Sequence, residues 1–211
     1  MIPSKTEWMG ALIGRHGLDL HKRFSSATIA VCGLGGLGSN IAVALARAGV
    51  GKLLLIDFDR VDITNLHRQQ YKANQIGLHK ADALAENLSE IALYTEITAV
   101  TAKITEENFA DLLKEADVVC EAFDNAEAKA MLVNGVLEQL PNCYLVAASG
   151  MAGMDTPNTI RTRKVMKRFY LCGDETNDVA DTIGLVAPRV MLCAAHQAHT
   201  VLRILAGEYE V

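Results

Sequence analysis

The sequence predicts an α/β fold, namely a Rossmann-like and mainly parallel sheet with helices on both faces. Short apolar runs alternate along the chain with longer segments of helical periodicity, which is the pattern of repeated β-α-β units. The first apolar run ends at a glycine cluster, Gly33–Gly38, as is typical of a strand-to-helix turn in such sheets. Antiparallel strands are expected only near the C-terminal part.

Each element follows from a local pattern. Thr28–Cys32 is β-branched and apolar and stops at glycine, so it is the first expected strand. Ser39–Ala48 is rich in alanine and leucine and precedes Gly49, a typical helix C-terminal glycine. The same reasoning predicts further strands at Leu53–Asp57, Glu96–Val100, Val118–Ala122 and Tyr144–Ala148, and helices at Lys80–Leu93, Glu106–Lys114 and Ala126–Glu138.

The two ends of the chain are less regular. Residues 1–26 are expected to form an N-terminal helical segment, and Thr159–Arg163 an antiparallel strand. The polar segment Lys164–Gly184 is interpreted as an irregular, crossover-like loop, and the apolar segment Ala187–Leu205 as the last helix. We interpret residues 1–211 as a single domain.

Composition excludes several classes of protein. Half of the 211 residues are hydrophobic and 21% are charged, which is enough for a packed core. The net charge of −5 and the lack of a dense Lys/Arg cluster argue against a nucleic-acid partner. No apolar segment reaches the roughly 18 residues of a membrane span. The five cysteines form no C-x-x-C pair, which favours a reducing, cytoplasmic setting.

Three polar segments are expected at one edge of the sheet, because ligands of parallel sheets bind beyond the carboxyl ends of the strands. These segments are Gly33–Ser39, Asp57–Arg68 and Asp124–Asn125.

The glycine segment predicts a nucleotide site. Gly33, Gly35 and Gly38 form a G-x-G-x-x-G pattern that also includes Gly36. Glycines permit a tight turn and close approach of the backbone to a phosphate, and the following helix supplies N–H donors. Asp57, at the end of the second expected strand, is a candidate acceptor for ribose hydroxyls, a role that Asp59 could share. These features suit NAD and ATP equally well.

The next block favours ATP. Asn65, Arg68 and Lys80 could bring one amide and two permanent charges to a single anionic ligand. Hydride transfer does not need two extra cations, whereas a triphosphate whose leaving group gains charge does. Either cation alone would more often be a surface charge.

Asp124 and Asn125 follow the fourth strand of the parallel set. A carboxylate that faces phosphates is well placed to hold Mg²⁺. Both residue types also suit the N-cap of the helix that follows, and the roles are compatible if Asn125 caps while Asp124 faces the metal.

These segments resemble the family of enzymes that activate ubiquitin-like proteins, specifically its ThiF/MoeB branch, over about residues 28–150. The matching motifs are GLGGLGS, DFD, NLHRQ, Lys80 and DN. GRHG at Gly14–Gly17 and AASGMAG at Ala147–Gly153 are similar to the short ThiF-type sulfur carrier adenylyltransferases.

The resemblance implies a reaction, a partner and a cofactor. The C-terminal glycine carboxylate of a small ubiquitin-like sulfur carrier (ThiS-like, ending in Gly-Gly) would attack the α-phosphate of ATP, giving acyl-adenylate and pyrophosphate in thiamine thiazole biosynthesis. It implies that Asp57 holds the ribose, that Arg68 and Lys80 hold phosphates and that Asp124 holds Mg²⁺. In a homodimer, Arg15 would reach the ATP of the partner.

Three departures from the family pattern are visible. The structural zinc of the family needs two C-x-x-C pairs, so no zinc is expected here. Lys129 stands where relatives carry an arginine after the D-N pair. A second, sulfur-transferring step would need an accessible thiol; Cys172 in FYLCG is the best-placed candidate, against the alternative of a packed, inert thiol.

Other functions remain open. The same chemistry could act on a MoaD-like carrier, or on a tRNA carboxylate, which the acidic charge disfavours. An NAD-dependent oxidoreductase would explain only the glycine segment and Asp57. A non-catalytic nucleotide-binding module that recruits a carrier protein is the last alternative.

Overall fold

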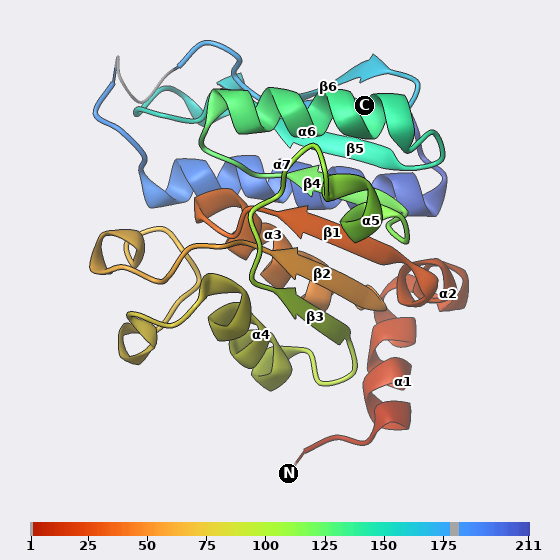
Figure 1. The fold of residues 1–211 in the computed structure, drawn as a ribbon. Helices are drawn as coiled ribbons and strands as arrows, with labels where there is room; N and C mark the ends of the chain where they lie inside the picture. Colours follow the sequence, from red (N-terminus) through yellow and green to blue (C-terminus); the bar gives the residue numbers. More distant parts are fainter. Residues whose placement is uncertain (1, 178–181) are drawn as a thin grey trace.

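The computed structural model describes residues 2–177 and 182–211 of the 211-residue chain. Seven strands form one sheet in the order β3-β2-β1-β4-β5-β7-β6 (Figure 1). The strands are β1 Thr28–Cys32, β2 Lys52–Ile56, β3 Glu96–Val100, β4 Val118–Glu121, β5 Tyr144–Ala148, β6 Arg161–Met166 and β7 Phe169–Gly173. Every pairing is parallel except that of β6 with β7, so the predicted fold class is confirmed.

The strand register brings the functional segments to one level. Cys32, the last residue of β1, lies opposite Ile56 at the end of β2 and Glu121 at the end of β4. The central strands are apolar because parallel strands covered on both faces bury every side chain. The turns after β1, β2 and β4 therefore start side by side at the carboxyl edge of the sheet.

Helices cover both faces of the sheet. The helices are α1 Lys5–His16, α2 Leu18–Ser26, α3 Gly36–Arg47, α4 Lys80–Ile91, α5 Phe109–Leu113, α6 Ala126–Gln139 and α7 Ala187–Ala206. Helices α3, α4 and α7 share one apolar core through residues such as Ile41, Leu84 and Val201. Helices α5 and α6 form a second core with Phe109 and Leu132, and Figure 1 shows α6 and α7 on opposite sides of the sheet.

Helices α1 and α2 lie at the amino edge of the sheet, opposite the turns just described (Figure 1). The amide of Gly51, one residue before β2, donates to Phe24 O in α2 at 2.9 Å. The Tyr94 hydroxyl, just before β3, donates to Pro3 O at 2.7 Å. This segment therefore packs on the ends of the strands that lie farthest from the glycine turn.

The interpretation of Lys164–Gly184 as an irregular loop is wrong for its first half. Lys164 continues β6, and residues 169–173 form β7, which pairs with β5 and β6. The charged side chains of β6 are tolerated because it is an edge strand with one exposed face, so its sequence carries little apolar signal. Residues 178–181 of that segment lie outside the described residues.

Among residues 2–177 and 182–211, no helix combines the length and apolar character that a bilayer-spanning segment requires.

The contact between α5 and α6 generates a stability prediction. A Cβ added at Gly135 in α6 would lie 2.6 Å from the ring of Phe109, which is 2% exposed. We expect Gly135→Ala to lower the free energy of unfolding by about 1–3 kcal/mol, because a packed ring must move. Urea denaturation followed by circular dichroism measures the change.

Gly10→Ala is the matched control, because the space around Gly10 in α1 is open. Alanine favours a helix interior over glycine by up to about 1 kcal/mol, so this variant should keep or gain stability. Equal stability of the two variants would contradict the prediction.

Candidate active site

The glycine turn between β1 and α3 is packed too tightly for side chains. Gly33 has a φ of +87°, and a Cβ added there would lie 2.8 Å from Ala122 O at the end of β4. A Cβ added at Gly38 would lie 1.8 Å from Gly33 O. Glycine is required at both positions, and the turn consequently touches the neighbouring strand end.

The start of α3 is open to an anion. The helix begins at Gly36 with Gly35 as N-cap, and no side chain among the described residues caps it. The first N–H groups of a helix have no acceptor within the helix, and the helix dipole is positive there. A phosphate is the ligand that such an end favours.

Asp57 braces the glycine turn. It is 8% exposed; its Oδ2 accepts from Leu34 N at 2.6 Å and its Oδ1 from Asp59 N at 2.8 Å. The Tyr71 hydroxyl donates to Leu34 O at 2.7 Å, which holds the same residue from its other side. Asp57 thus has a structural role that the sequence did not indicate, and its ribose contact stays a prediction.

Lys80 opens α4 and forms an ion pair with Asp59. The Nζ–Oδ2 distance is 2.8 Å, and Lys80 is only 7% exposed. Because Asp59 N also donates to Asp57, the three residues form one chain from α4 to the glycine turn. Lys80 is therefore brought to the expected edge of the sheet.

Arg68 lies beside the glycine turn. Asn40 in α3 donates through its amide to Arg68 O at 3.1 Å and to Gly36 O at 2.6 Å. The Ser39 hydroxyl accepts from Gln70 N at 3.1 Å. A Cβ on Gly36 would lie 3.4 Å from Arg68 Nε, a buried atom with no partner among the described residues. The Arg68 Nε–H group, buried beside a helix N-terminus and without an acceptor among the described residues, suits an anionic ligand.

Asn65 belongs to the short 3₁₀ helix Ile63–Asn65. Its Oδ1 accepts from Asp62 N at 3.1 Å, and its carbonyl accepts from Arg68 N at 3.2 Å. Asn65 thus shapes the segment that carries Arg68, and its own contact with a ligand stays a prediction.

Of the two roles predicted for Asp124 and Asn125, the structure shows the helix cap, and the metal contact stays a prediction. Asn125 Oδ1 accepts from Ala128 N at 2.9 Å and caps α6. Asp124 is exposed and makes no hydrogen bond or ion pair within the part of the chain that the structure describes. Its neighbour Phe123 contacts the glycine turn, since the Phe123 ring would lie 2.9 Å from a Cβ on Gly33.

A free carboxylate beside a phosphate-binding turn fits Mg²⁺, which usually takes one or two carboxylates and completes its shell with phosphate oxygens and water. Among the described residues, no group of three or more His, Cys, Asp and Glu gathers as a metal cage would require. A cation at Asp124 would therefore have to arrive with a phosphate ligand.

Sequence reasoning missed the role of Glu121 at the end of β4. Its carboxylate is fully buried and accepts from Lys129 Nζ at 2.5 Å and from Phe123 N at 2.7 Å. Burial raises the pKa of Glu121, and the Lys129 ammonium opposes that effect. Lys129 also donates to Ala148 O at 2.9 Å, so it ties β4 to β5. The sequence did carry a signal for this role, namely a lone acidic residue in an apolar strand.

Two predicted residues lie apart from this group. Cys172 is fully buried in β7, and burial raises the pKa of its thiol to about 11, which matches the packed, inert thiol expected from the sequence as the alternative to a reactive one. A thiol needs exposure and a low pKa to react. Arg15 is exposed on α1 at the opposite edge, so it could meet a nucleotide only on another copy of the chain.

The structure thus gathers the glycine turn, Asp57, Asp59, Arg68 and Lys80 at one edge, with Asp124 beside them across Phe123. A helix N-terminus, two cations and an exposed carboxylate are groups of the kinds that bind phosphates and their metal ions.

The chain is similar to known proteins in sequence and in fold. The chain is 30% identical over 194 residues to the sulfur carrier protein ThiS adenylyltransferase of Bacillus subtilis (strain 168), covering 89% of this chain and 56% of that protein. It therefore spans little more than half the length of that relative. It is also 30% identical over 192 residues to the molybdopterin-synthase adenylyltransferase of Escherichia coli (strain K12), covering 90% of this chain and 77% of that protein.

A similar fold occurs in a solved structure of E. coli tRNA N6-threonylcarbamoyladenosine dehydratase, TcdA, in complex with ATP. The TM-score is 0.85 at 23% identity, and the match covers 99% of this chain and 98% of that one. The ThiF family matches residues 9–211. With this match over nearly the whole chain, and with the glycine turn and strand order described above, the chain belongs to the ThiF family.

Proposed function

We propose that this chain uses ATP to adenylylate the C-terminal glycine carboxylate of a small ubiquitin-like sulfur carrier protein ending in Gly-Gly. The ThiS-like carrier of thiamine thiazole biosynthesis is the favoured substrate. The support is the family and the similarity to the ThiS adenylyltransferase of B. subtilis.

One observation carries the proposal: Arg68 Nε is buried beside Gly36, at the N-terminus of α3, and has no hydrogen-bond partner among residues 2–177 and 182–211. A dinucleotide held by the helix end would not need this cation or Lys80. A triphosphate does, because charge develops on the departing pyrophosphate. The site therefore favours transfer of a nucleotidyl group over transfer of hydride.

In the proposed reaction, a carboxylate oxygen of the carrier forms a bond to the α-phosphorus while the bond from that phosphorus to the bridging oxygen breaks. The electron pair leaves with the pyrophosphate. A carboxylate is already ionised at neutral pH, so no general base is needed. Arg68, Lys80 and the α3 N-terminus would position the phosphates and stabilise the leaving charge.

Asp124 is the residue that would hold Mg²⁺, which would add positive charge at the phosphates. Arg15 is proposed to contribute from the second subunit of a homodimer. Its exposure on α1 supports this role, because it lies away from the turn in its own chain.

Two related substrates compete with the ThiS-like carrier. A MoaD-like carrier is supported by the similarity to a molybdopterin-synthase adenylyltransferase, and the chemistry would be the same. A carboxylate on tRNA is supported by the fold shared with TcdA. The net charge of −5 favours a protein carrier over a polyanion.

The proposal predicts carrier-dependent exchange of labelled pyrophosphate into ATP when Mg²⁺ is present. Asp124→Ala should abolish the exchange, because the phosphates lose their metal ligand. Arg68→Ala should lower it by roughly 10²–10³-fold, as expected when one donor to a developing negative charge is lost. A filter assay with ThiS-like and MoaD-like carriers and with tRNA measures the rates and ranks the substrates.

Lys167→Ala is the matched control, because it removes an exposed cation from the turn between β6 and β7, at the amino edge. It should leave the rate unchanged. ATP binding without exchange for any substrate would favour the non-catalytic module. NADH binding without exchange would favour the oxidoreductase; either result contradicts the proposal.

We also propose that the chain forms the adenylate without a covalent step on its own cysteines. All five are free and buried, and burial raises the thiol pKa of Cys32, Cys120, Cys143, Cys172 and Cys193.

The native protein should therefore show no fast-reacting thiol with Ellman's reagent at pH 7.5, and the denatured protein should show five. Absorbance at 412 nm measures both. Rapid modification of Cys172 in the native protein, located by peptide mass spectrometry, would contradict this prediction.

A further inference from the structure

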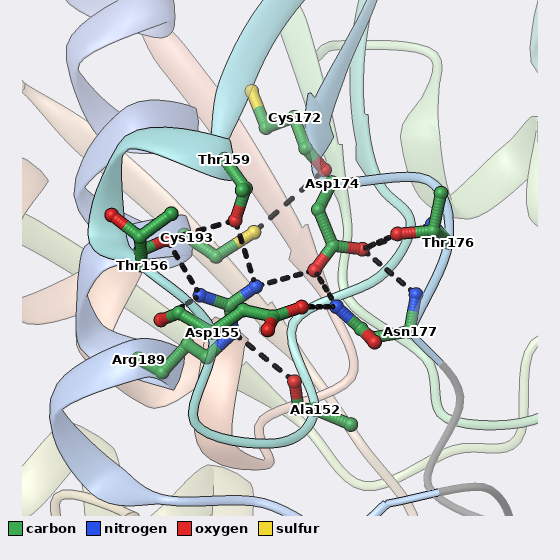
Figure 2. A network of polar contacts seen from close by, with 10 residues as sticks. All are labelled: Ala152, Asp155, Thr156, Thr159, Cys172, Asp174, Thr176, Asn177, Arg189 and Cys193. Atoms are coloured by element: carbon green, nitrogen blue, oxygen red, sulfur yellow. Dashed lines mark hydrogen bonds and ion pairs between the residues drawn. The ribbon is translucent and has the colours of Figure 1, made fainter.

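Arg189 is a buried arginine for which the proposed chemistry gives no role. It lies in the first turn of α7 and is 6% exposed. Figure 2 shows its guanidinium among loop oxygens and the Asp174 carboxylate. Its acceptors are Ala152 O, Asp155 O, Thr156 O, Thr159 Oγ1 and Asp174 Oδ2, at 3.0–3.2 Å for the first four. Nε and both terminal nitrogens donate, so the whole planar fork is engaged.

Asp174 anchors this arginine from the end of β7. Its side chain is 2% exposed and accepts from Thr176 N and Asn177 N, each at 2.9 Å. Burial alone would raise the pKa of Asp174, but these amides, the Asn177 side chain and Arg189 hold it well below its usual range. Asp174 N also donates to Gly150 O at 3.0 Å. The ion pair is thus built into the backbone of both segments.

The segment that Arg189 holds, residues 149–159, begins where β5 ends. Gly150 and Gly153 have φ values of +77° and +80°, and a Cβ on Gly150 would lie 2.1 Å from Asp174 Oδ1. The segment 149–154 reads Ser-Gly-Met-Ala-Gly-Met; Ala152 and Gly153 are buried, whereas Ser149 and Gly150 are partly exposed and have little or no side chain, so an extended chain can lie close to the backbone there. Glycine adopts these positive φ values without strain, so the backbone conformation alone does not fix the segment; its contacts with Arg189 and Asp174 do.

The first turn of α7 also touches the glycine turn. Val190, next to Arg189, lies so close to Gly36 that a Cβ there would be 2.9 Å from Val190 Cγ1. The residues expected to hold the nucleotide follow β1 and β2, whereas β5 lies on the other side of β4. The loop after β5 therefore lies on the side of Asp124 that faces away from the expected ribose site.

We propose that Arg189 is a positioning residue for the acyl substrate. Asp174 anchors the Arg189 guanidinium, which holds residues 149–156 in place. The glycine-ended C-terminal segment of the carrier lies along these residues to reach the α-phosphate. The inference rests on the proposed function. Lysine cannot replace the arginine, because an ammonium lacks the planar fork that reaches five separate acceptors.

Pyrophosphate exchange with Arg189→Lys tests the inference. The KM for the carrier should rise at least about tenfold, because a displaced loop misaligns the carboxylate. The KM for ATP should stay within about twofold, because the phosphate-binding residues lie on other turns. A loss of stability alone would lower the active fraction and change neither KM. Asp174→Asn is the second variant and should shift the carrier KM in the same direction.

Arg163→Lys is the matched control. Arg163 pairs with Glu175, the neighbour of Asp174, at 2.7 Å, but both side chains are about half exposed. The substitution is the same, but this pair is solvated, and among the described residues the Arg163 side chain bonds only to the Glu175 carboxylate. The backbone bond from Glu175 N to Ser149 O, at 3.0 Å, does not depend on that side chain. Both KM values should be unchanged.

Hydrogen exchange at the amides of residues 150–156 tests the role of Arg189 separately from the proposed function. In Arg189→Lys these amides should lose protection while those of β1 and β4 keep it, whatever the activity. Normal loop protection with unchanged KM values overturns the role of Arg189 alone. If the wild-type protein shows no pyrophosphate exchange with any substrate, the proposed function is overturned. The hydrogen-exchange result then decides whether Arg189 orders the loop.

Discussion

The site depends on a steric constraint: the turn after β1 has room only for glycine at the points where it meets itself and the end of β4. A methyl group on Gly38 would clash with Gly33 O, and a methyl group on Gly33 would clash with the backbone of Ala122. Because these backbones touch, the N-terminus of α3 lies directly beside the turn that carries Asp124. The close packing of the sheet thereby determines the spacing between the anion-binding end of a helix and a free carboxylate.

Charged side chains at this edge fall into two groups. Lys129 and Arg189 are held by buried carboxylates, Glu121 and Asp174, and join neighbouring strand ends. Buried ion pairs of this kind tolerate the loss of neither partner, so they act as fixed parts of the framework. Arg68 differs, because its Nε has no acceptor among the residues that the structure describes. A ligand is therefore best sought at Arg68, although Lys129 lies nearer to the D-N motif in sequence.

The fold class, both helical layers and the gathering of the glycine turn with Asp57, Arg68 and Lys80 could be predicted from the sequence. Apolar runs and glycines determine strands and turns locally, and parallel strands bring their carboxyl ends together. Thr159–Arg163 was expected to be an antiparallel strand, and β6 spans Arg161–Met166, but β7 was not predicted, because the polar residues on both sides of Phe169–Gly173 made the whole segment resemble a loop. The partners of Lys129 and Arg189 were also hidden, since a carboxylate 8 or 15 residues away becomes a neighbour only when the chain folds.

The ion pair between Lys80 and Asp59 has a consequence for how the site meets its ligand. A free lysine side chain loses roughly 2 kcal/mol of rotamer entropy when it is immobilised. Lys80 is already confined, since it is 7% exposed and bound to Asp59 at 2.8 Å. Most of its freedom is thus lost during folding, so in the proposed function a phosphate would only have to replace the Asp59 carboxylate, which is itself half exposed. The ammonium group would then be in position before the nucleotide binds.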